Sequence, residues 1–552
     1  MGNNKSKNDF IIQAGILAAA GIISRVIGLL YRSPLHGVIG DRGMGYYNSA
    51  YSFYSIILLV SSYSIPSAIS KVIAQKLAVK EYRNAHRIFK CALAYVLVVG
   101  GIAGLFLFFC AGLFVVPEAV PVLRTFAPTI FIYGILGVLR GYFQAHKSMV
   151  QTSASQIFEQ IANATVSIGA AYFLIRAAFG SLEMPTEGSR VTERAVRGAI
   201  GSALGTGAGV LVALLFMLGV YALNKKLIDT RIRRDRHGEL DSYGAIIKMI
   251  TMVVTPFILS TAIYNLSGTI NTTIYTKLYP AMKSLGDMDI MSRWGIFSNQ
   301  PLTISNIPIA FASAMASAMI PSVAQFIAAK RIEEAREKIG VAVKSTMMIS
   351  IPSAVGLFVL AEPVTNLLFP TNSPEALHTA ATLLMTLCLS VVFYALSTLN
   401  SSILQGLGKV NTPIVNAAVA LAIQSVVAVV LLKLTEFDLY SVAIANTLYS
   451  GVMCVLNQQA VRRAIGYRQE ILRTFGVTSL AAVGMGACAW AVYEGMLLLT
   501  DSPRISVLPA IVLAAVVYFV LLILFRGVTE EELRGFPKGH LMVKVAKKCR
   551  LM

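Results

Sequence analysis

Long apolar stretches, separated by short polar segments, follow one another along almost the whole chain. A helix that crosses the hydrocarbon core of a bilayer needs about 20 mostly apolar residues, and each stretch reaches that length. The pattern therefore predicts an all-α polytopic membrane protein with about fourteen transmembrane helices. The predicted spans cover residues 11–31, 48–70, 91–115, 124–143, 153–176, 198–222, 246–277, 296–325, 341–365, 377–404, 412–433, 438–460, 475–498 and 505–525.

The composition of the chain agrees with a membrane protein. Hydrophobic residues make up 56% of the chain and charged residues only 13%, whereas soluble domains contain about 25% charged residues. A net charge of +20 is also typical of nucleic-acid-binding proteins, but here the basic residues are divided among short segments between the spans. We therefore expect no nucleic-acid partner, and we interpret the positive charge as a signal for membrane topology.

The distribution of the basic residues predicts how the chain is oriented. If the amino terminus is cytoplasmic, most Lys and Arg residues fall on the cytoplasmic side, as the positive-inside rule requires. The first ten residues contain no small-residue cleavage site, so we expect the first span to remain as a helix. Both termini are then cytoplasmic. The other cytoplasmic segments are residues 71–90, 223–245, 326–340 and 461–474, and the carboxyl-terminal segment is 526–552.

Two sequence echoes indicate an internal repeat. Ile-Pro-Ser occurs at residues 65–67 and again at 320–322, each time at the inner end of a span and before a basic segment. The sequences QAHKSMVQT at 144–152 and QGLGKVNT at 405–412 join successive spans at nearly the same separation. Proline followed by basic residues is common in membrane proteins, but two echoes at one offset favour a duplication. Since both copies begin on the cytoplasmic side, the repeat is parallel.

This repeat predicts two six-helix lobes followed by two further helices. The N-lobe covers residues 1–222, a basic cytoplasmic linker covers 223–245, and the C-lobe covers 246–463. Residues 464–552 then hold helices 13 and 14 and a basic cytoplasmic tail.

The first span carries a positive charge far from both of its ends. Arg25 lies on the order of 20 Å from the amino-terminal edge of the span, so its side chain cannot reach that edge. It must find an anion, a polar cavity or a protein partner. Arg32 follows nearly two helical turns later, so the two guanidinium groups point the same way roughly 10 Å apart. Their planar donors suit phosphate oxygens.

We interpret Arg25 and Arg32 as two binding positions for an anionic substrate. In the alternative interpretation, Arg25 pairs with a carboxylate on another helix and Arg32 lies in the outer head-group zone.

Spans seven and eight are unusually rich in hydroxyl and amide side chains. Facing lipid, such groups would lack water as a partner, so the cluster as a whole favours a hydrated cavity. Hydrogen bonding between helices is the simpler explanation for any single residue. The candidate substrate-binding residues of this cavity are Asn265, Asn299 and Asn306.

Arg140 and Glu159 are the other charges of interest inside predicted spans. They lie nearly equidistant from the middle of the short turn at 144–152, so in an antiparallel hairpin they reach similar depths. We favour a structural ion pair, and Glu159 is the candidate if a proton is carried.

Motifs for enzymatic chemistry are absent or weak. The chain contains no GxxxxGK[ST], HExxH or GxSxG motif. The six cysteines form no CxxC pair, so we expect no metal site and no cofactor. Asp287 and Asp289 form an isolated DxD in a predicted outer loop, which a metal-dependent glycosyltransferase could use, but a solvated loop is favoured. We therefore expect that the protein is not an enzyme.

Four short motifs resemble a known family of transporters. They are SRVIG at 24–28, IPSAISK at 65–71, RGYFQ at 140–144 and SQIFEQ at 155–160. With these motifs, the chain resembles polysaccharide-biosynthesis flippases of the stage V sporulation protein B type. These are relatives of the MurJ lipid II flippases in the multidrug/oligosaccharidyl-lipid/polysaccharide superfamily. The resemblance covers essentially the whole chain.

The resemblance implies a bacterial plasma-membrane flippase with two lobes around a central cavity. The implied activity is movement of an undecaprenyl-diphosphate-linked saccharide, lipid II above all, to the outer leaflet by alternating access. Arg25 matches a cavity arginine that binds the diphosphate in the MurJ branch, and Arg32 fits the next one after a shift of one residue. The implied partners are the polyprenyl-diphosphate-linked saccharide and membrane lipid, and we expect a monomer.

Two features depart from the MurJ pattern. A cavity arginine expected early in span eight has no match, since Thr303 stands near that position and Arg293 lies farther outward. Span seven has no aspartate, so sodium coupling is not implied. The alternatives are a flippase for another cell-surface polysaccharide and a cation-coupled multidrug exporter. An exporter would favour acidic cavity residues, whereas this chain offers arginine.

Overall fold

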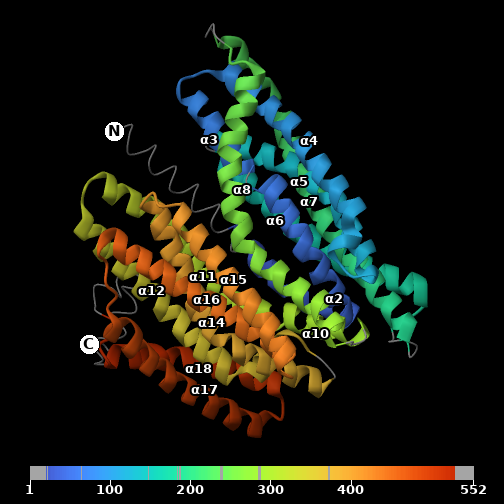
Figure 1. Ribbon diagram of the computed structural model, residues 1–552, viewed down its shortest axis with the longest axis vertical. Coiled ribbons are helices and arrows are strands. Elements are labelled where there is room, and N and C mark those ends of the chain that lie inside the picture. The colour runs from blue at the N-terminus through green and yellow to red at the C-terminus, as the bar shows by residue number, and fades with distance from the viewer. Residues whose placement is uncertain are drawn as a thin grey trace. The chain divides into compact units, whose positions relative to one another are not determined.

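Every element that the structure describes is a helix (Figure 1). The computed structural model describes residues 20–21, 23–63, 65–146, 148–182, 185, 188–235, 240–283, 287–370 and 373–528. Its contacts divide the chain into two compact units, Met1–Gly295 and Ile296–Met552. The lobes predicted from the repeat divide the chain differently, at 223–245, and they remain a prediction.

The first unit contains a helical segment at 23–30 and most of the helices of the amino-terminal half. These are α2 (Arg32–Leu58), η1 (Leu59–Tyr63), α3 (Ile65–Ala78), α4 (Tyr82–Phe114), η2 (Pro117–Ala119), α5 (Val120–Ala145), α6 (Met149–Phe179), α7 (Gly188–Arg234), α8 (Tyr243–Thr273), η3 (Ile274–Leu278), α9 (Tyr279–Lys283) and most of α10 (Asp287–Asn299). Helix α5 packs against α3, α4 and α7, and α6 packs along α7.

The second unit contains the remaining helices. These are α11 (Pro301–Ala328), α12 (Ile332–Val359), α13 (Ala361–Leu368), α14 (Pro374–Gly406), α15 (Asn411–Leu434), α16 (Leu439–Ile465), η4 (Leu472–Val477), α17 (Thr478–Thr500) and α18 (Pro503–Leu524). Helix α14 packs against α11, α12 and α16, and α17 runs beside α18.

Ten helices of the described residues are long and apolar enough to cross a membrane. They coincide with ten of the fourteen predicted spans. Each of the other four, 11–31, 48–70, 246–277 and 296–325, includes residues or side chains outside the described part of the chain. The prediction of a multi-span, all-helical membrane protein is thus confirmed, and the count of fourteen stays a prediction.

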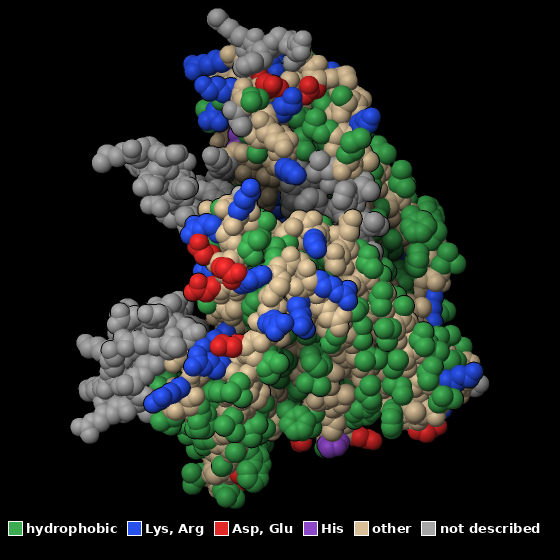
Figure 2. Space-filling view, turned by 60° about the vertical axis from the view of Figure 1, so that its left-hand side comes forward, with side chains coloured by type: hydrophobic (Ala, Val, Ile, Leu, Met, Phe, Trp, Pro, Cys, Tyr) green, Lys and Arg blue, Asp and Glu red, His purple; other side chains and the backbone are tan. Residues whose placement is uncertain are grey.

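Large apolar side chains are exposed on helices of both units. Phe109 on α4 is 72% exposed, and Leu498 on α17 is 85% exposed. Figure 2 shows hydrophobic side chains over wide areas of the visible face, with Lys and Arg gathered in limited groups. Soluble monomers rarely expose such apolar areas, so these surfaces face lipid.

Two segments expected between spans are helical. The segment after the first span belongs to α2, which is interrupted only at Gly40. There φ is 70°, a left-handed value that glycine adopts without strain. Helix α7 continues past the predicted span to Arg234, so about half of the predicted basic linker is helix. Charged residues end a membrane span, but they do not end a helix.

The sequence echoes correspond to close approaches within each unit. In the first unit, a Cβ at Gly141 of α5 would lie 2.7 Å from the carbonyl oxygen of Pro66 in α3. In the second, a Cβ at Gly406 of α14 would lie 2.9 Å from the carbonyl oxygen of Ile320 in α11. In both cases a glycine at the end of one long helix allows contact with the helix that carries Ile-Pro-Ser.

Candidate functional site

Arg25 lies on an exposed side of the helical segment 23–30. The amide of Tyr31 donates to the carbonyl of Ile27 (3.1 Å), and the amide of Leu35 donates to that of Tyr31 (3.1 Å). These bonds carry the helix into α2, whose first residue, Arg32, is half-buried. The backbone therefore stays helical from Arg25 to Arg32 through Tyr31, and the shared side of the two arginines stays a prediction from helical periodicity.

The arginine-bearing segment packs along α6. A Cβ at Gly28 would lie 3.6 Å from Oε1 of Gln160. Farther along, Tyr31 and Leu35 belong to one buried cluster with Ala171 and Ile175 of α6. Gly28 closes the SRVIG motif and Gln160 closes SQIFEQ, so two motifs far apart in the sequence are neighbours in space.

Arg140 and Glu159 form an ion pair between α5 and α6. Nη2 of Arg140 donates to Oε2 of Glu159 at 2.7 Å, and Nε donates to Oγ of Ser155 at 2.9 Å. The side chain of Arg140 is 6% exposed and that of Glu159 is 16% exposed. At such burial each charge depends on the other, because an unpaired charge in a membrane helix is costly.

Glycines hold the helices close on both sides of this ion pair. A Cβ at Gly209 of α7 would lie 2.6 Å from the carbonyl oxygen of Glu159. On the other side, Gly141 brings α5 against Pro66 of α3. All four motifs that carry the family resemblance therefore lie in one connected set of contacts within the first unit.

The three candidate asparagines fall in different units. Asn265 is exposed on α8 of the first unit, and Asn306 is exposed on α11 of the second. Asn299 ends α10, is fully buried, and has no hydrogen-bond partner among the described residues for either amide atom. A buried amide without a partner is costly and needs an explanation, such as water or a ligand.

Part of the polar cluster of span seven binds another helix. Oγ1 of Thr272 donates to Oγ of Ser52 at 3.1 Å, and Oγ1 of Thr269 donates to the carbonyl of Ser52 at 3.1 Å. These hydroxyls join α8 to α2 and are not available to line a hydrated cavity. For these two residues the structure shows the hydrogen bonding between helices that the sequence analysis favoured for any single residue, and the cavity expected from the cluster as a whole stays a prediction.

The side chains of Asp287 and Asp289 lie outside the described part of the chain. Across the described ranges, no three His, Cys, Asp or Glu side chains are grouped closely enough to hold a metal ion.

Arg194 is a buried arginine that the sequence analysis did not single out. It is 4% exposed on α7, and its Nη2 donates to the carbonyls of Val38 (3.0 Å) and Leu182 (2.8 Å). Val38 lies in α2 just before the interruption at Gly40, and Leu182 lies in a bend after α6. Arg194 therefore joins α7 to α2 and to the end of the α6 connection. In the sequence, Arg194 is marked only as a basic residue just before the predicted span 198–222, which does not indicate a buried hydrogen-bonding role.

The family follows from the sequence comparison. Residues 85–500 match the model of the family "Lipid II flippase MurJ". The chain belongs to the MurJ family. That range contains Arg140, Glu159 and the three asparagines, and it begins after Arg25 and Arg32.

Two relatives of this MurJ-family chain come from Bacillus subtilis (strain 168). The lipid II flippase MurJ is 24% identical over 493 residues, which cover 85% of this chain and 86% of the relative. Stage V sporulation protein B is 22% identical over 550 residues, which cover 98% of this chain and all of the relative. Both names agree with the resemblance in the sequence motifs.

Solved structures of the superfamily share the fold. A lipid II flippase MurJ in an inward closed conformation aligns with a TM-score of 0.65 at 13% identity, over 92% of this chain and 98% of that chain. An inward-facing MATE-family multidrug transporter of the MOP superfamily aligns with a TM-score of 0.60 at 16% identity, over 83% of this chain and 98% of that one. This MurJ-family protein therefore has the MOP fold.

Proposed function

We propose that this MurJ-family flippase moves lipid II, an undecaprenyl-diphosphate-linked peptidoglycan precursor, from the inner to the outer leaflet. Movement is by alternating access of two lobes in the bacterial plasma membrane, with both chain termini in the cytoplasm. The protein acts as a monomer. The alternative, export of drugs, has support only from the fold shared with MATE transporters.

The observation that carries the proposal is Arg25. Arg25 is exposed on the helical segment 23–30, inside a long apolar stretch of the sequence and at a depth where a charge needs an anion or a hydrated cavity. A diphosphate supplies two phosphate groups to a pair of arginines on one side of the helix, and guanidinium groups bind phosphate oxygens in bidentate fashion. Asn265, Asn299 and Asn306 are proposed as further contacts for the saccharide or diphosphate.

Complementation of a bacterium depleted of its own lipid II flippase tests this proposal. We expect the wild-type chain to restore growth and Arg25→Ala to lower lipid II export by at least about tenfold, the loss of one strong charged contact. Arg25→Lys separates charge from guanidinium geometry and should restore export only in part. Arg504→Ala removes an exposed arginine at the start of α18 and serves as the matched control.

The outcomes separate the alternatives at equal membrane abundance. If the wild-type chain inserts but does not restore growth, lipid II is the wrong cargo, and assays of other lipid-linked glycans and of drug export follow. If Arg25→Ala restores growth as well as wild type, Arg25 has a structural role and the proposed binding position is wrong.

A further inference from the structure

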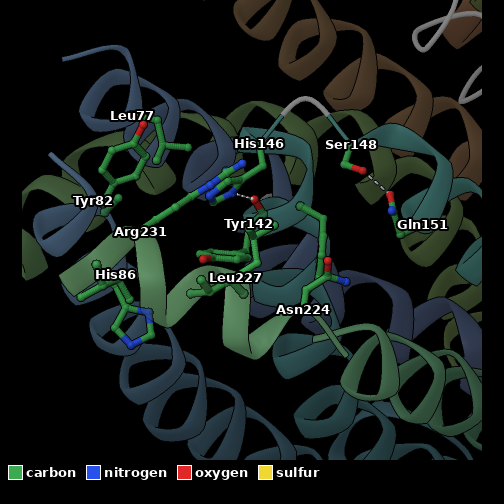
Figure 3. Close-up of a pocket in the computed structure, with 14 residues that line it drawn as sticks. Leu77, Tyr82, His86, Tyr142, His146, Ser148, Gln151, Asn224, Leu227 and Arg231 are labelled. Atoms are coloured by element: carbon green, nitrogen blue, oxygen red, sulfur yellow. Dashed lines mark hydrogen bonds between the residues drawn. The ribbon is translucent and has the colours of Figure 1, made fainter. Parts of the chain in front are cut away.

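A cavity of about 190 Å³ lies at one end of the helix bundle in the first unit (Figure 3). It forms where α3 and α5 end, where α4 and α6 begin, and where α7 passes beside them. Tyr142, Phe143 and Ile228 are buried in its wall. This is the end of the bundle that carries the basic segment 71–90 and the carboxyl-terminal part of α7, which topology predicts to be cytoplasmic.

Polar side chains from two helices and a turn line the same cavity. Asn224 and Arg231 come from α7, Gln151 from α6, and His146 from the turn between α5 and α6. Figure 3 shows Arg231 reaching from α7 toward His146 and Tyr142. Arg231 has no ion-pair partner among the described residues, so its charge is available at the cavity.

The cavity is otherwise poor in negative charge. No Asp or Glu is among the described residues that line it. Asp229 is the acid whose field reaches the lining residues Tyr142 and His86, and Lys90 adds a positive charge beside His86. The first turn of α6 also lies at the cavity, and its amides carry the partial positive charge of a helix amino terminus. Its N-cap residue, Ser148, makes no capping bond with its side chain.

His146 supplies an acceptor. Its Nδ1 lies 2.9 Å from the carbonyl oxygen of Tyr142, so this nitrogen carries the proton and donates it. Burial, with a smaller contribution from Arg231, lowers the pKa of His146 below its usual value. The ring is therefore neutral at pH 7, and Nε2 can accept a hydrogen bond from a hydroxyl group.

The size of the cavity limits its ligand. Sites for drug-sized ligands measure about 300–1,000 Å³, so this one fits a much smaller molecule. One free guanidinium, helix-terminal amides and a hydroxyl acceptor suit a phosphate group attached to a small polyol. Basic pockets between transmembrane helices at the cytoplasmic face also bind the head groups of anionic lipids.

We propose that this cavity binds a glycerophosphoryl group, with its phosphate at Arg231 and a glycerol hydroxyl at His146. The group belongs either to the head of phosphatidylglycerol or to free glycerol 3-phosphate. In both cases the ligand joins α7 to the α5–α6 turn, and so stabilises this end of the bundle. None of the lining residues is a proposed contact for lipid II, so the two proposals fail independently.

The test uses the full-length chain in phosphatidylcholine nanodiscs. Phosphatidylglycerol is added to the nanodisc lipid in one arm, and glycerol 3-phosphate is added to the buffer in the other. Native mass spectrometry measures bound phosphatidylglycerol, and the thermal unfolding midpoint is recorded in both arms. We expect an added ligand to raise the midpoint of the wild-type chain, and Arg231→Gln to weaken binding by about tenfold.

Two further variants keep the result interpretable. Arg233→Gln removes an exposed charge on the same helix that does not line the cavity, and it should bind like wild type. Leu227→Trp enlarges a 53% exposed side chain at the cavity and should weaken binding while leaving the charge unchanged.

Stabilisation by phosphatidylglycerol alone assigns the site to a lipid head group, and stabilisation by glycerol 3-phosphate assigns it to the soluble ester. The proposal is overturned if the wild-type chain binds neither probe. It is equally overturned if Arg231→Gln and Arg233→Gln bind alike, because the attraction would then come from the general charge of α7.

Discussion

At the scale of single residues, Glu159 is both a partner in the buried ion pair with Arg140 and the candidate proton carrier. Its two hydrogen bonds join α5 to α6. Removal of one partner leaves the other charge buried and uncompensated, which is far more costly than the loss of an exposed pair. The same carboxylate is the candidate proton carrier, so one substitution examines both roles.

We predict that Glu159→Gln lowers the free energy of unfolding by about 3 kcal/mol, because Arg140 loses its counter-charge. The matched control is Glu193→Gln, which breaks the exposed pair with Arg197 (43% and 52% exposed for Arg197 and Glu193) and should cost less than about 1 kcal/mol. Denaturant unfolding of the two purified variants makes the comparison.

The pH profile of export separates the two roles of Glu159. A carboxylate that carries a proton gives a profile that flattens in Glu159→Gln, whereas a purely structural pair leaves the shape of the profile unchanged. If Glu159→Gln and Glu193→Gln have equal free energies of unfolding, the stabilising role assigned to the buried pair of Arg140 and Glu159 is wrong.

At the scale of helices, α6 and α7 are held together by small residues. A Cβ at Gly201 would lie 2.4 Å from the backbone nitrogen and Cα of Ala171, and one at Gly205 would lie 2.1 Å from Oγ of Ser167. Small residues at such crossings allow backbones to approach, which is a main source of attraction between helices in lipid.

We predict that Gly201→Ala destabilises the protein by about 2 kcal/mol, because the added methyl group forces α6 and α7 apart. Gly219→Ala on the same helix meets nothing within 4 Å and should be neutral or stabilising by about 0.5 kcal/mol, through helix propensity. Thermal unfolding in detergent measures both. A destabilisation by Gly219→Ala as large as that by Gly201→Ala would mean that the crossing is not the cause.

At the scale of the whole molecule, the distribution of basic residues predicts which loops face the cytoplasm. In a chain whose native cysteines are replaced, we expect Arg463→Cys to react only from the inside and Arg504→Cys only from the outside. Both positions are exposed at helix ends, so their reactivity differs through topology alone. An impermeant maleimide applied to intact cells and to inverted vesicles measures it, and labelling of both positions from one side would refute the orientation.

The sequence by itself determined the elements that depend on local composition. The length of the apolar stretches predicted ten of the observed helices correctly. Inside the hydrocarbon core a single segment satisfies all its backbone hydrogen bonds only as a helix. The pairing of Arg140 with Glu159 was also predicted from the sequence, because a short turn between two antiparallel helices places both charges at the same depth. The shared side of Arg25 and Arg32 follows from helical periodicity.

Only the tertiary structure decided where helices continue beyond the bilayer and which of them touch. Helix α7 extends to Arg234. The apolar pattern shows where the span leaves the bilayer, but it does not show whether the helix continues in water. The contact of Gly28 with Gln160, and the cavity at Arg231, depend on residues far apart in the chain. Their positions arise from the packing of whole helices, which periodicity within one helix does not encode.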